Sequence, residues 1–195
     1  MKKAYLVISK TNQGASFRLI KEAVDEASEG KKVLFITTEL NVYHITERIH
    51  GYVNGTEINS EILDITVRQA KDLNFMESDE KFDVVIIDSP YLLFQWEPMV
   101  YPYPPYEKIF DIIGEALLIM NVQVSRNNYE NGCFQVLGFH LFPKWVIRAT
   151  YLEKIDIVYV ETSIDLLTCA KNDVASVFIL KKAPMTEIPY LTKIV

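Results

Sequence analysis

The sequence predicts one α/β domain in which a parallel sheet is extended by antiparallel strands in the C-terminal half. Short apolar, β-rich runs alternate with amphipathic helical stretches as far as Ser125, and the rest of the chain is mostly strand-like. Strands that alternate with helices form parallel sheets, whereas consecutive strands pair antiparallel. The chain has 195 residues, of which 49% are hydrophobic, so it can bury one core and we expect a single domain over residues 1–195.

The first expected elements form a strand–helix–strand unit. Residues 4–8 are an apolar strand, residues 17–29 an amphipathic helix, and residues 33–37 a second buried strand. Residues 9–16 join the first strand to the helix, and Glu39 follows the second strand. In open α/β sheets ligands bind outside the carboxyl ends of the strands. We therefore expect Glu39 to face this loop, although a simple exposed carboxylate is the alternative.

The loop at residues 9–16 has the position of a phosphate-binding loop and only part of its chemistry. The pattern G-x-x-x-x-G-K-[ST] surrounds phosphate with backbone N–H groups and adds a lysine and a magnesium-binding hydroxyl. Gly14 and Ser16 match the second glycine and the hydroxyl, whereas Ser9 and Ala15 replace the first glycine and the lysine. An ordinary strand–helix turn is the alternative interpretation.

Two helical patterns follow the second strand. Residues 42–52 have apolar side chains at helical spacing, and Asn41 is a candidate N-cap. A second helical pattern lies within residues 57–75, after a turn at Asn54 and Gly55. We expect a helix in each segment.

The strand at residues 82–88 is the most buried-looking in the sequence, and it ends in Asp88. An aspartate in this place is typical of a Walker B position, where the carboxylate holds magnesium through water. Ser16 and Asp88 are therefore the candidate magnesium residues. An ordinary polar strand end is the alternative.

Residues 89–107 are unusually rich in proline and aromatic residues, and proline is incompatible with a regular helix or a central strand. The segment predicts a docking surface for a protein or a stacking platform for bases. A loop folded back onto its own sheet is the alternative. The candidate partner-binding residues are Tyr91, Phe94, Trp96, Tyr101, Tyr103 and Tyr106.

The C-terminal half is expected to begin with a helix at residues 107–116 and to continue with strands. The expected strands are residues 117–125, 133–142, 145–148, 155–161, 166–170 and 176–181, with a hairpin turn at 172–173. Basic residues in this half predict a nucleic-acid-binding face, and a solvated charged edge is the alternative. They are Arg126, Lys144, Arg148, Lys171, Lys181 and Lys182.

Composition excludes several classes of protein. A formal net charge of −6 argues against a surface that coats nucleic acid non-specifically. The 2 cysteines and 3 histidines have neither a disulfide framework nor metal-ligand spacing. The N-terminal apolar run is too short for a signal peptide or a membrane span, so we expect a cytoplasmic protein with no membrane contact and no domain before the first strand.

In order and spacing these features resemble the RecA-like motor domain of DnaB-type replicative helicases along nearly the whole chain. The resemblance implies a RecA-like three-layer sandwich with a P-loop, in which Glu39 is the catalytic residue if the protein is active. The matching segments are residues 29–40 and 45–49 for the second strand, the glutamate and the next helix, 82–88 for the Walker B strand, 122–128 for the sensor strand, 151–161 for the next core strand and 168–173 for the hairpin that reaches a neighbouring subunit.

The departures from that family concern charge. Ala15 replaces the lysine that would offset the phosphates, Arg126 stands where the sensor glutamine is expected, and Asp173 replaces the arginine finger. Transition-state contacts of this kind are worth orders of magnitude in rate. The family's upstream domain and linker helix also have no counterpart before residue 3. The resemblance therefore implies a degenerate site.

Three functional hypotheses follow. The leading one is a non-catalytic RecA/DnaB-like protein, of phage or other mobile-element type, that binds no cofactor and acts as a binding or regulatory subunit in replication, recombination or transcription through a protein partner at residues 89–107. The second is a slow ATPase that uses Lys10, Thr11, Gly14, Ser16 and Asp88 to bind ATP and magnesium and Glu39 to orient water. The third is a nucleotide-free structural or nucleic-acid-binding module. Each leaves self-association open.

Overall fold

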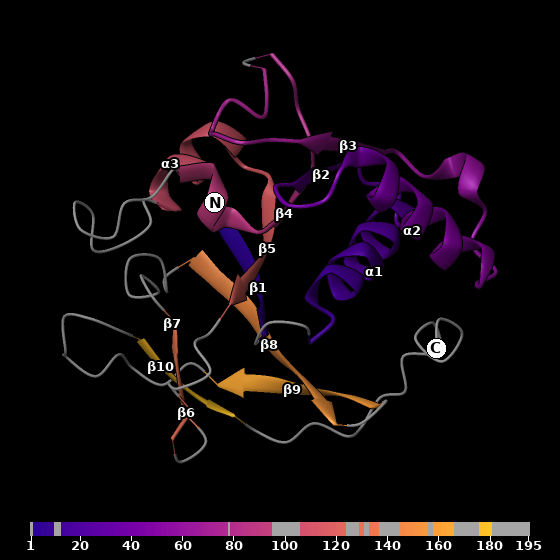
Figure 1. The fold of residues 1–195 in the computed structure, drawn as a ribbon. Coiled ribbons are helices and arrows are strands. Elements are labelled where there is room, and N and C mark those ends of the chain that lie inside the picture. The colour runs from indigo at the N-terminus through magenta and orange to yellow at the C-terminus, as the bar shows by residue number, and fades with distance from the viewer. Residues whose placement is uncertain are drawn as a thin grey trace.

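The fold was analysed in a computed structural model that describes residues 2–9, 13–77, 79–94, 106–123, 129–130, 133–136, 145–155, 158–165 and 176–180. One long sheet runs through the molecule, with helices on both of its faces (Figure 1). The strand order is β3-β2-β4-β5-β1-β8-β9-β10-β7-β6. The N-terminal strand β1 therefore lies in the interior of the sheet, with β5 on one side and β8 on the other.

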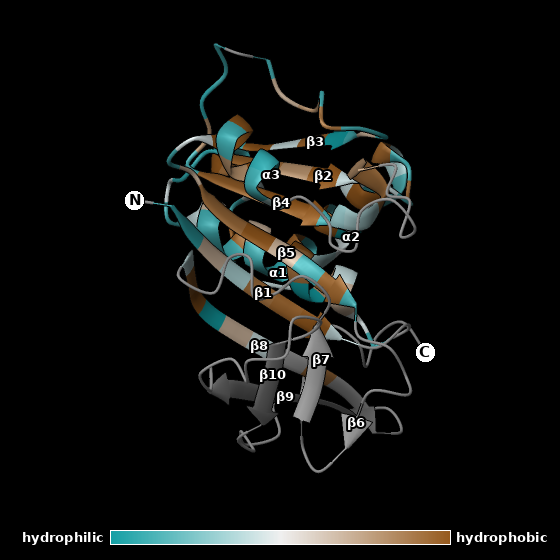
Figure 2. Cartoon of the chain, turned by 90° about the vertical axis from the view of Figure 1, so that its left-hand side faces the viewer, coloured by the Kyte–Doolittle hydropathy of each residue, from teal (hydrophilic) through white to brown (hydrophobic). Residues whose placement is uncertain are grey.

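The first six strands in this order are parallel, which confirms the predicted α/β class. They are β1 (Lys3–Ser9), β2 (Val33–Thr37), β3 (Ile65–Gln69), β4 (Val84–Asp88), β5 (Leu117–Gln123) and β8 (Val146–Ile155). Their side chains alternate between two buried faces. Ala4, Leu6 and Ile8 of β1 belong to one core cluster, and Tyr5 and Val7 to the other. Apolar colour accordingly runs along the central strands (Figure 2).

Beyond β8 the strands pair antiparallel. These pairs join β8 to β9 (Val158–Asp165), β9 to β10 (Ser176–Leu180), β10 to β7 (Cys133–Val136) and β7 to β6 (Tyr129–Glu130). The strand breaks differ from the expected ones, because β8 is one continuous strand of 10 residues where we expected separate strands at 145–148 and 155–161. The strand expected at 166–170 and the turn at 172–173 lie outside the described residues.

Helices α1 (Ala15–Ser28) and α2 (Val42–Asn54) cover one face of the parallel sheet. Gly14 precedes α1 with φ of 79°, a left-handed conformation that glycine adopts without a Cβ clash. Asn41 caps α2 as predicted, since its side chain accepts a hydrogen bond from the His44 N–H at 2.9 Å. Both helices agree with the sequence prediction.

The predicted helix within residues 57–75 is wrong. The segment contains the single 3₁₀ turn η1 (Ser60–Ile62) and the strand β3 (Ile65–Gln69), which pairs parallel with β2. The apparent helical spacing joins apolar residues that lie on either side of the chain's turn into β3. Within β3 itself, β-branched Ile65, Thr66 and Val67 favour an extended backbone.

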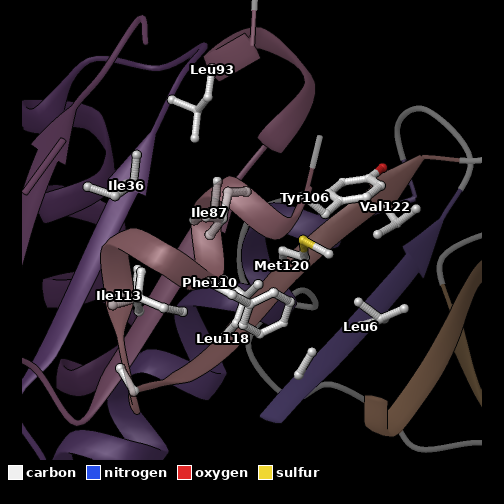
Figure 3. Packing of buried hydrophobic residues seen from close by; sticks show 14 of the residues in the cluster. Leu6, Ile36, Ile87, Leu93, Tyr106, Phe110, Ile113, Leu118, Met120 and Val122 are labelled. Atoms are coloured by element: carbon white, nitrogen blue, oxygen red, sulfur yellow. The ribbon is translucent and has the colours of Figure 1, made fainter. Parts of the chain in front are cut away.

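The second face is covered by α3 (Tyr106–Ile113) and by the 3₁₀ helix η2 (Pro90–Phe94). Tyr106 is completely buried and lies beside Met120 and Val122 of β5 (Figure 3). The prediction that Tyr106 docks a partner is therefore wrong, because its ring is part of the core. Tyr91 and Phe94 pack edge-on against it at centroid distances of 6.5 and 5.9 Å, as expected if this part of the loop folds onto its own sheet.

Candidate functional site

Three adjacent strands bring polar side chains to their carboxyl ends. Asp88 ends β4, Asn121 lies near the end of β5, and Ser9 ends β1. The Ser9 hydroxyl donates to Asn121 Oδ1 at 3.3 Å, and Asn121 Nδ2 donates to Asp88 Oδ1 at 3.2 Å. All three side chains are more than 90% buried. The result is a continuous hydrogen-bonded chain across β1, β5 and β4.

Helix α1 adds a hydroxyl to this chain. Ser16, the second residue of α1, is hydrogen-bonded to the Asp88 carboxylate. Burial raises the pKa of Asp88 above its ordinary value, while the hydrogen bonds from Ser16 and Asn121 and the charge of Arg48 act against this rise. The structure therefore brings together the two residues that the sequence predicts for magnesium, Ser16 and Asp88.

The donor set at this point fits a magnesium ion. Magnesium prefers oxygen ligands and keeps several waters, so one carboxylate, one hydroxyl and nucleotide phosphates suffice to hold it. Ser16 and Asp88 supply the first two. Among the described residues there is no group of 3 or more His, Cys, Asp or Glu side chains that could hold a metal ion, so no self-sufficient protein cage is found there.

Glu39 lies on an anchored turn after β2. The Thr37 hydroxyl accepts from the Leu40 N–H at 3.1 Å and donates to the Leu40 carbonyl at 2.8 Å. The Thr38 N–H donates to the Asp88 carbonyl at 2.8 Å, and the Thr38 hydroxyl accepts from the Ser89 N–H at 3.0 Å. Glu39 itself is exposed. Hydrogen bonds on both sides therefore fix its position next to the end of β4.

Arg48 is a cation of this site that sequence reasoning did not single out. It belongs to α2, its guanidinium carbon lies 5.1 Å from the centre of the Phe17 ring in α1, and its charge acts on Asp88. Arg48 thus approaches the start of α1 from the neighbouring helix. Only the packing of α2 against α1, which the sequence does not display, brings this charge close.

Gln123 is a second residue that was missed. It is the last residue of β5, it is exposed, and it pairs with Ser9 in the register of β1 and β5. The sequence analysis placed the sensor position at Arg126, which lies outside the described residues. Gln123 is a polar residue at the strand end beside the phosphate-loop position, so it is the better candidate for that role.

The two remaining phosphate-loop candidates, Lys10 and Thr11, lie outside the described residues, and their roles stay predictions. Gly14 is placed at the N-terminus of α1. Its left-handed backbone and the following helix start are compatible with an anion bound by backbone N–H groups. The loop side of the site is therefore described only from residue 13 onward.

Two solved structures compare with this arrangement over most of its length. The ATPase domain of a DnaB-type helicase superimposes with a TM-score of 0.56 at 12% identity, covering 84% of this chain and 76% of the other. The RadB recombinase superimposes with a TM-score of 0.54 at 12% identity, covering 83% and 80%. The chain has a RecA-like fold. No family model and no curated protein sequence matches it.

In this RecA-like fold, a bulge determines where Arg148 points. Ala4 pairs with Val146 and Tyr5 pairs with Arg148, so Ile147 is an extra residue in β8. A bulge of this kind re-aims the side chains that follow it. Arg148 consequently lies over the Tyr5 ring, with its guanidinium carbon 4.4 Å from the ring centre.

Arg148 joins a buried polar cluster under α1. Glu22 is paired with Arg18 at 2.6 Å and lies 4.0 Å from Arg148. The Tyr5 hydroxyl accepts from Arg18 and donates to Thr150, each at 3.2 Å. This packing gives Arg148 a structural role, and its predicted nucleic-acid role stays a prediction. Arg126, Lys144, Lys171, Lys181 and Lys182, named with it, lie outside the described residues.

None of the helices in the described part of the chain combines the length and the apolar character required to cross a lipid bilayer.

Proposed function

We propose that this protein is a RecA-like subunit that binds a magnesium–nucleotide at Ser16 and Asp88 without running a motor cycle. In this proposal the bound nucleotide serves a binding or regulatory role within a DNA or RNA transaction. The observation that supports it is the combination of an assembled Ser16–Asp88–Asn121 network with Ala15 at the lysine position. The proposal places the protein in the cytoplasm and leaves its source with phage or another mobile element.

The missing lysine separates binding from turnover. A lysine at residue 15 would neutralise charge that grows on the phosphates in the transition state, and losing such a contact costs several kcal/mol in barrier height. Ser16 and Asp88 act on the magnesium, whose binding does not require that lysine. Arg48 adds positive charge beside Asp88. We therefore expect nucleotide affinity to survive better than hydrolysis.

Calorimetric titration with Mg²⁺–ATP tests the proposal. Wild type is expected to bind, and Ser16→Ala is expected to weaken binding because it removes the hydroxyl at Asp88. Ala15→Lys should strengthen binding by about tenfold or more, since a phosphate contact by a charged donor is strong. Ala15→Met is the matched control, because it adds similar length without charge at this buried first residue of α1. No binding by wild type at millimolar nucleotide contradicts the proposal.

A slow NTPase is the second candidate, and the anchoring of Glu39 favours it. Thr37 and Thr38 hold the turn on both sides of Glu39, as an orienting residue for water requires. Under this alternative the purified protein consumes ATP slowly and Glu39→Gln abolishes the activity while binding is retained. Turnover that is absent in wild type and appears in Ala15→Lys favours the first candidate.

The partner in either case is proposed to be a protein that docks at residues 89–107. Leu92 of η2 is 51% exposed, and Tyr91 and Phe94 form the part of the segment that packs inward. Trp96, Tyr101 and Tyr103 lie outside the described residues. Pull-down with Trp96→Ala and Tyr103→Ala tests the segment, and unchanged partners remove it from consideration. Oligomerisation and nucleic-acid binding are open to sedimentation and to salt-dependent filter binding.

A further inference from the structure

Asn121 is an amide buried in a strand that is otherwise apolar around it. It is 3% exposed, and its neighbours along β5, Ile119, Met120 and Val122, are completely buried. An apolar side chain would fill this space without the desolvation cost that a buried amide carries. The cost is offset only because both ends of the amide are hydrogen-bonded, one to Ser9 and one to Asp88.

The sheet places Asn121 between its two partners. In the order β4-β5-β1, the residue before Asn121 pairs with the residue before Asp88 (Met120 with Ile87), and Asn121 pairs with Val7 on the other side. Side chains alternate along strands, so Ser9, Asn121 and Asp88 all lie on the face that α1 covers. This is the face from which Ser16 approaches Asp88.

The direction of the hydrogen bonds gives Ser9 a role as well. The Ser9 hydroxyl donates to Asn121 Oδ1, which leaves the amide N–H groups to face Asp88. Were the amide turned by half a rotation, its oxygen would face the carboxylate and repel it. Ser9, which stands at the first-glycine position of the phosphate loop, therefore selects the amide orientation that holds Asp88.

We propose that Asn121 is a positioning residue for Asp88 and that Ser9 orients Asn121, so that this pair sets the affinity of the Ser16–Asp88 site for the metal of a bound nucleotide. The inference rests on the proposed function. Groups that orient metal-bound carboxylates from behind typically contribute about 10- to 100-fold to metal affinity. Its consequence is that loss of either partner weakens metal-dependent binding specifically.

The test compares Mn²⁺–ADP with metal-free ADP by titration calorimetry, because Mn²⁺ accepts the same oxygen ligands as magnesium. Asn121→Leu keeps the volume and removes both hydrogen bonds, and it should weaken Mn²⁺–ADP binding by about 10- to 100-fold. Metal-free ADP should bind as it does to wild type. Asn121→Ser, which is smaller and too short to reach Asp88, provides a second variant if the leucine is poorly tolerated.

A double-mutant cycle tests the role of Ser9. Ser9→Ala alone should weaken Mn²⁺–ADP binding, and in the Asn121→Leu background it should have no further effect, because its action passes through the amide. Thr150→Val is the matched control. It removes a hydroxyl that is equally buried and hydrogen-bonded, to Tyr5, away from Asp88. It should leave Mn²⁺–ADP affinity at the wild-type value.

Three outcomes overturn the inference. Asn121→Leu and Asn121→Ser that bind Mn²⁺–ADP as wild type does show that the amide does not act on the metal. An equal loss of metal-free ADP binding shows a general structural defect. Additive effects of Ser9→Ala and Asn121→Leu show independent action. If wild type binds neither form of ADP, the proposed function fails together with this inference, whereas wild-type binding with unaffected variants refutes only the inference.

Discussion

Glu22 is the residue in which burial and pairing oppose each other most directly. It lies under α1 with a side chain that is 6% exposed, paired with Arg18 at 2.6 Å. Burial raises its pKa above the ordinary value, and the charges of Arg18 and Arg148 act in the opposite direction without cancelling the rise. Taking two charges out of water costs more here than their attraction returns.

The pH dependence of Glu22→Gln follows from this balance. A carboxyl with a raised pKa in the folded state binds protons more strongly there than in the unfolded chain. The stability of wild type therefore falls as pH rises from the ordinary value of 4.5 toward the raised one. Glutamine resembles the protonated form and shows no such fall.

We accordingly expect the free energy of unfolding of Glu22→Gln, relative to wild type, to increase between about pH 4.5 and about pH 8. Urea unfolding at the two pH values measures this difference. Asp111→Asn is a control, because Asp111 is an exposed carboxylate in a surface pair with Lys2. A relative stability of Glu22→Gln that decreases with pH would show that the ion pair outweighs its desolvation.

At the scale of elements, α2 links the cap at Asn41 to the cation at Arg48. The Asn41 side chain satisfies the His44 N–H at the first turn, and Ile45, Ile49 and Val53 bury one face of the helix. Replacing a capping side chain with alanine costs about 1 kcal/mol. The same loss loosens the turn that follows Glu39, since Asn41 lies only two residues further along.

Asn41→Ala is therefore expected to lower the free energy of unfolding by about 1 kcal/mol, measured in urea. Asn41→Ser and Asn41→Asp retain a capping oxygen and should stay close to wild type. Asn59→Ala offers a comparison within the same chain, because Asn59 caps only the single turn of η1 through the Glu61 N–H. Equal losses for the two alanine variants would mean that the cap of α2 carries no special stability.

Elements that follow one local pattern were predictable, and those fixed by distant partners were not. The apolar runs of β1, β2 and β4, and the N-cap at Asn41, are visible in the sequence because burial on both faces and capping are local requirements. β3 was missed because its alternation is short and its partner, β2, is distant in sequence. The bulge at Ile147 depends on β1 and leaves no local signal.

At the scale of the whole molecule, the sheet separates two cores of unequal cover. Helices α1 and α2 pack on one face, while the other is closed by the short α3 and η2. Phe110 of α3 is completely buried and contacts the Trp145 ring at a centroid distance of 4.5 Å. A large part of that second core therefore depends on a helix of 8 residues.

Phe110→Ala tests this dependence. Removing a fully buried phenylalanine leaves a cavity, and we expect a loss of about 3–5 kcal/mol in the free energy of unfolding. Leu92→Ala is the control on the same side of the sheet, because Leu92 is 51% exposed and should change stability by less than about 0.5 kcal/mol. A loss below about 1 kcal/mol for Phe110→Ala would indicate that the core collapses around the vacancy.

The candidate site was predictable in the same partial way. Ser16 and Asp88 stand at strand and helix ends that sequence patterns mark, and the structure brings them into contact. Asn121 and Arg48 were missed because each acts through packing between elements. Ser9 and Asn121, for example, are 112 positions apart. The roles of Lys10, Thr11 and the aromatic residues of 95–105 stay predictions.

Thr38 bonds the turn that carries Glu39 to the peptide that follows Asp88. Its N–H and hydroxyl engage the Asp88 carbonyl, the Ser89 carbonyl and the Ser89 N–H at 2.8 to 3.2 Å. Neither segment is therefore able to shift alone without breaking these bonds. Any ligand that pulls on the end of β4 transmits its displacement to the acidic turn, so occupancy at one carboxylate is mechanically reported at the other.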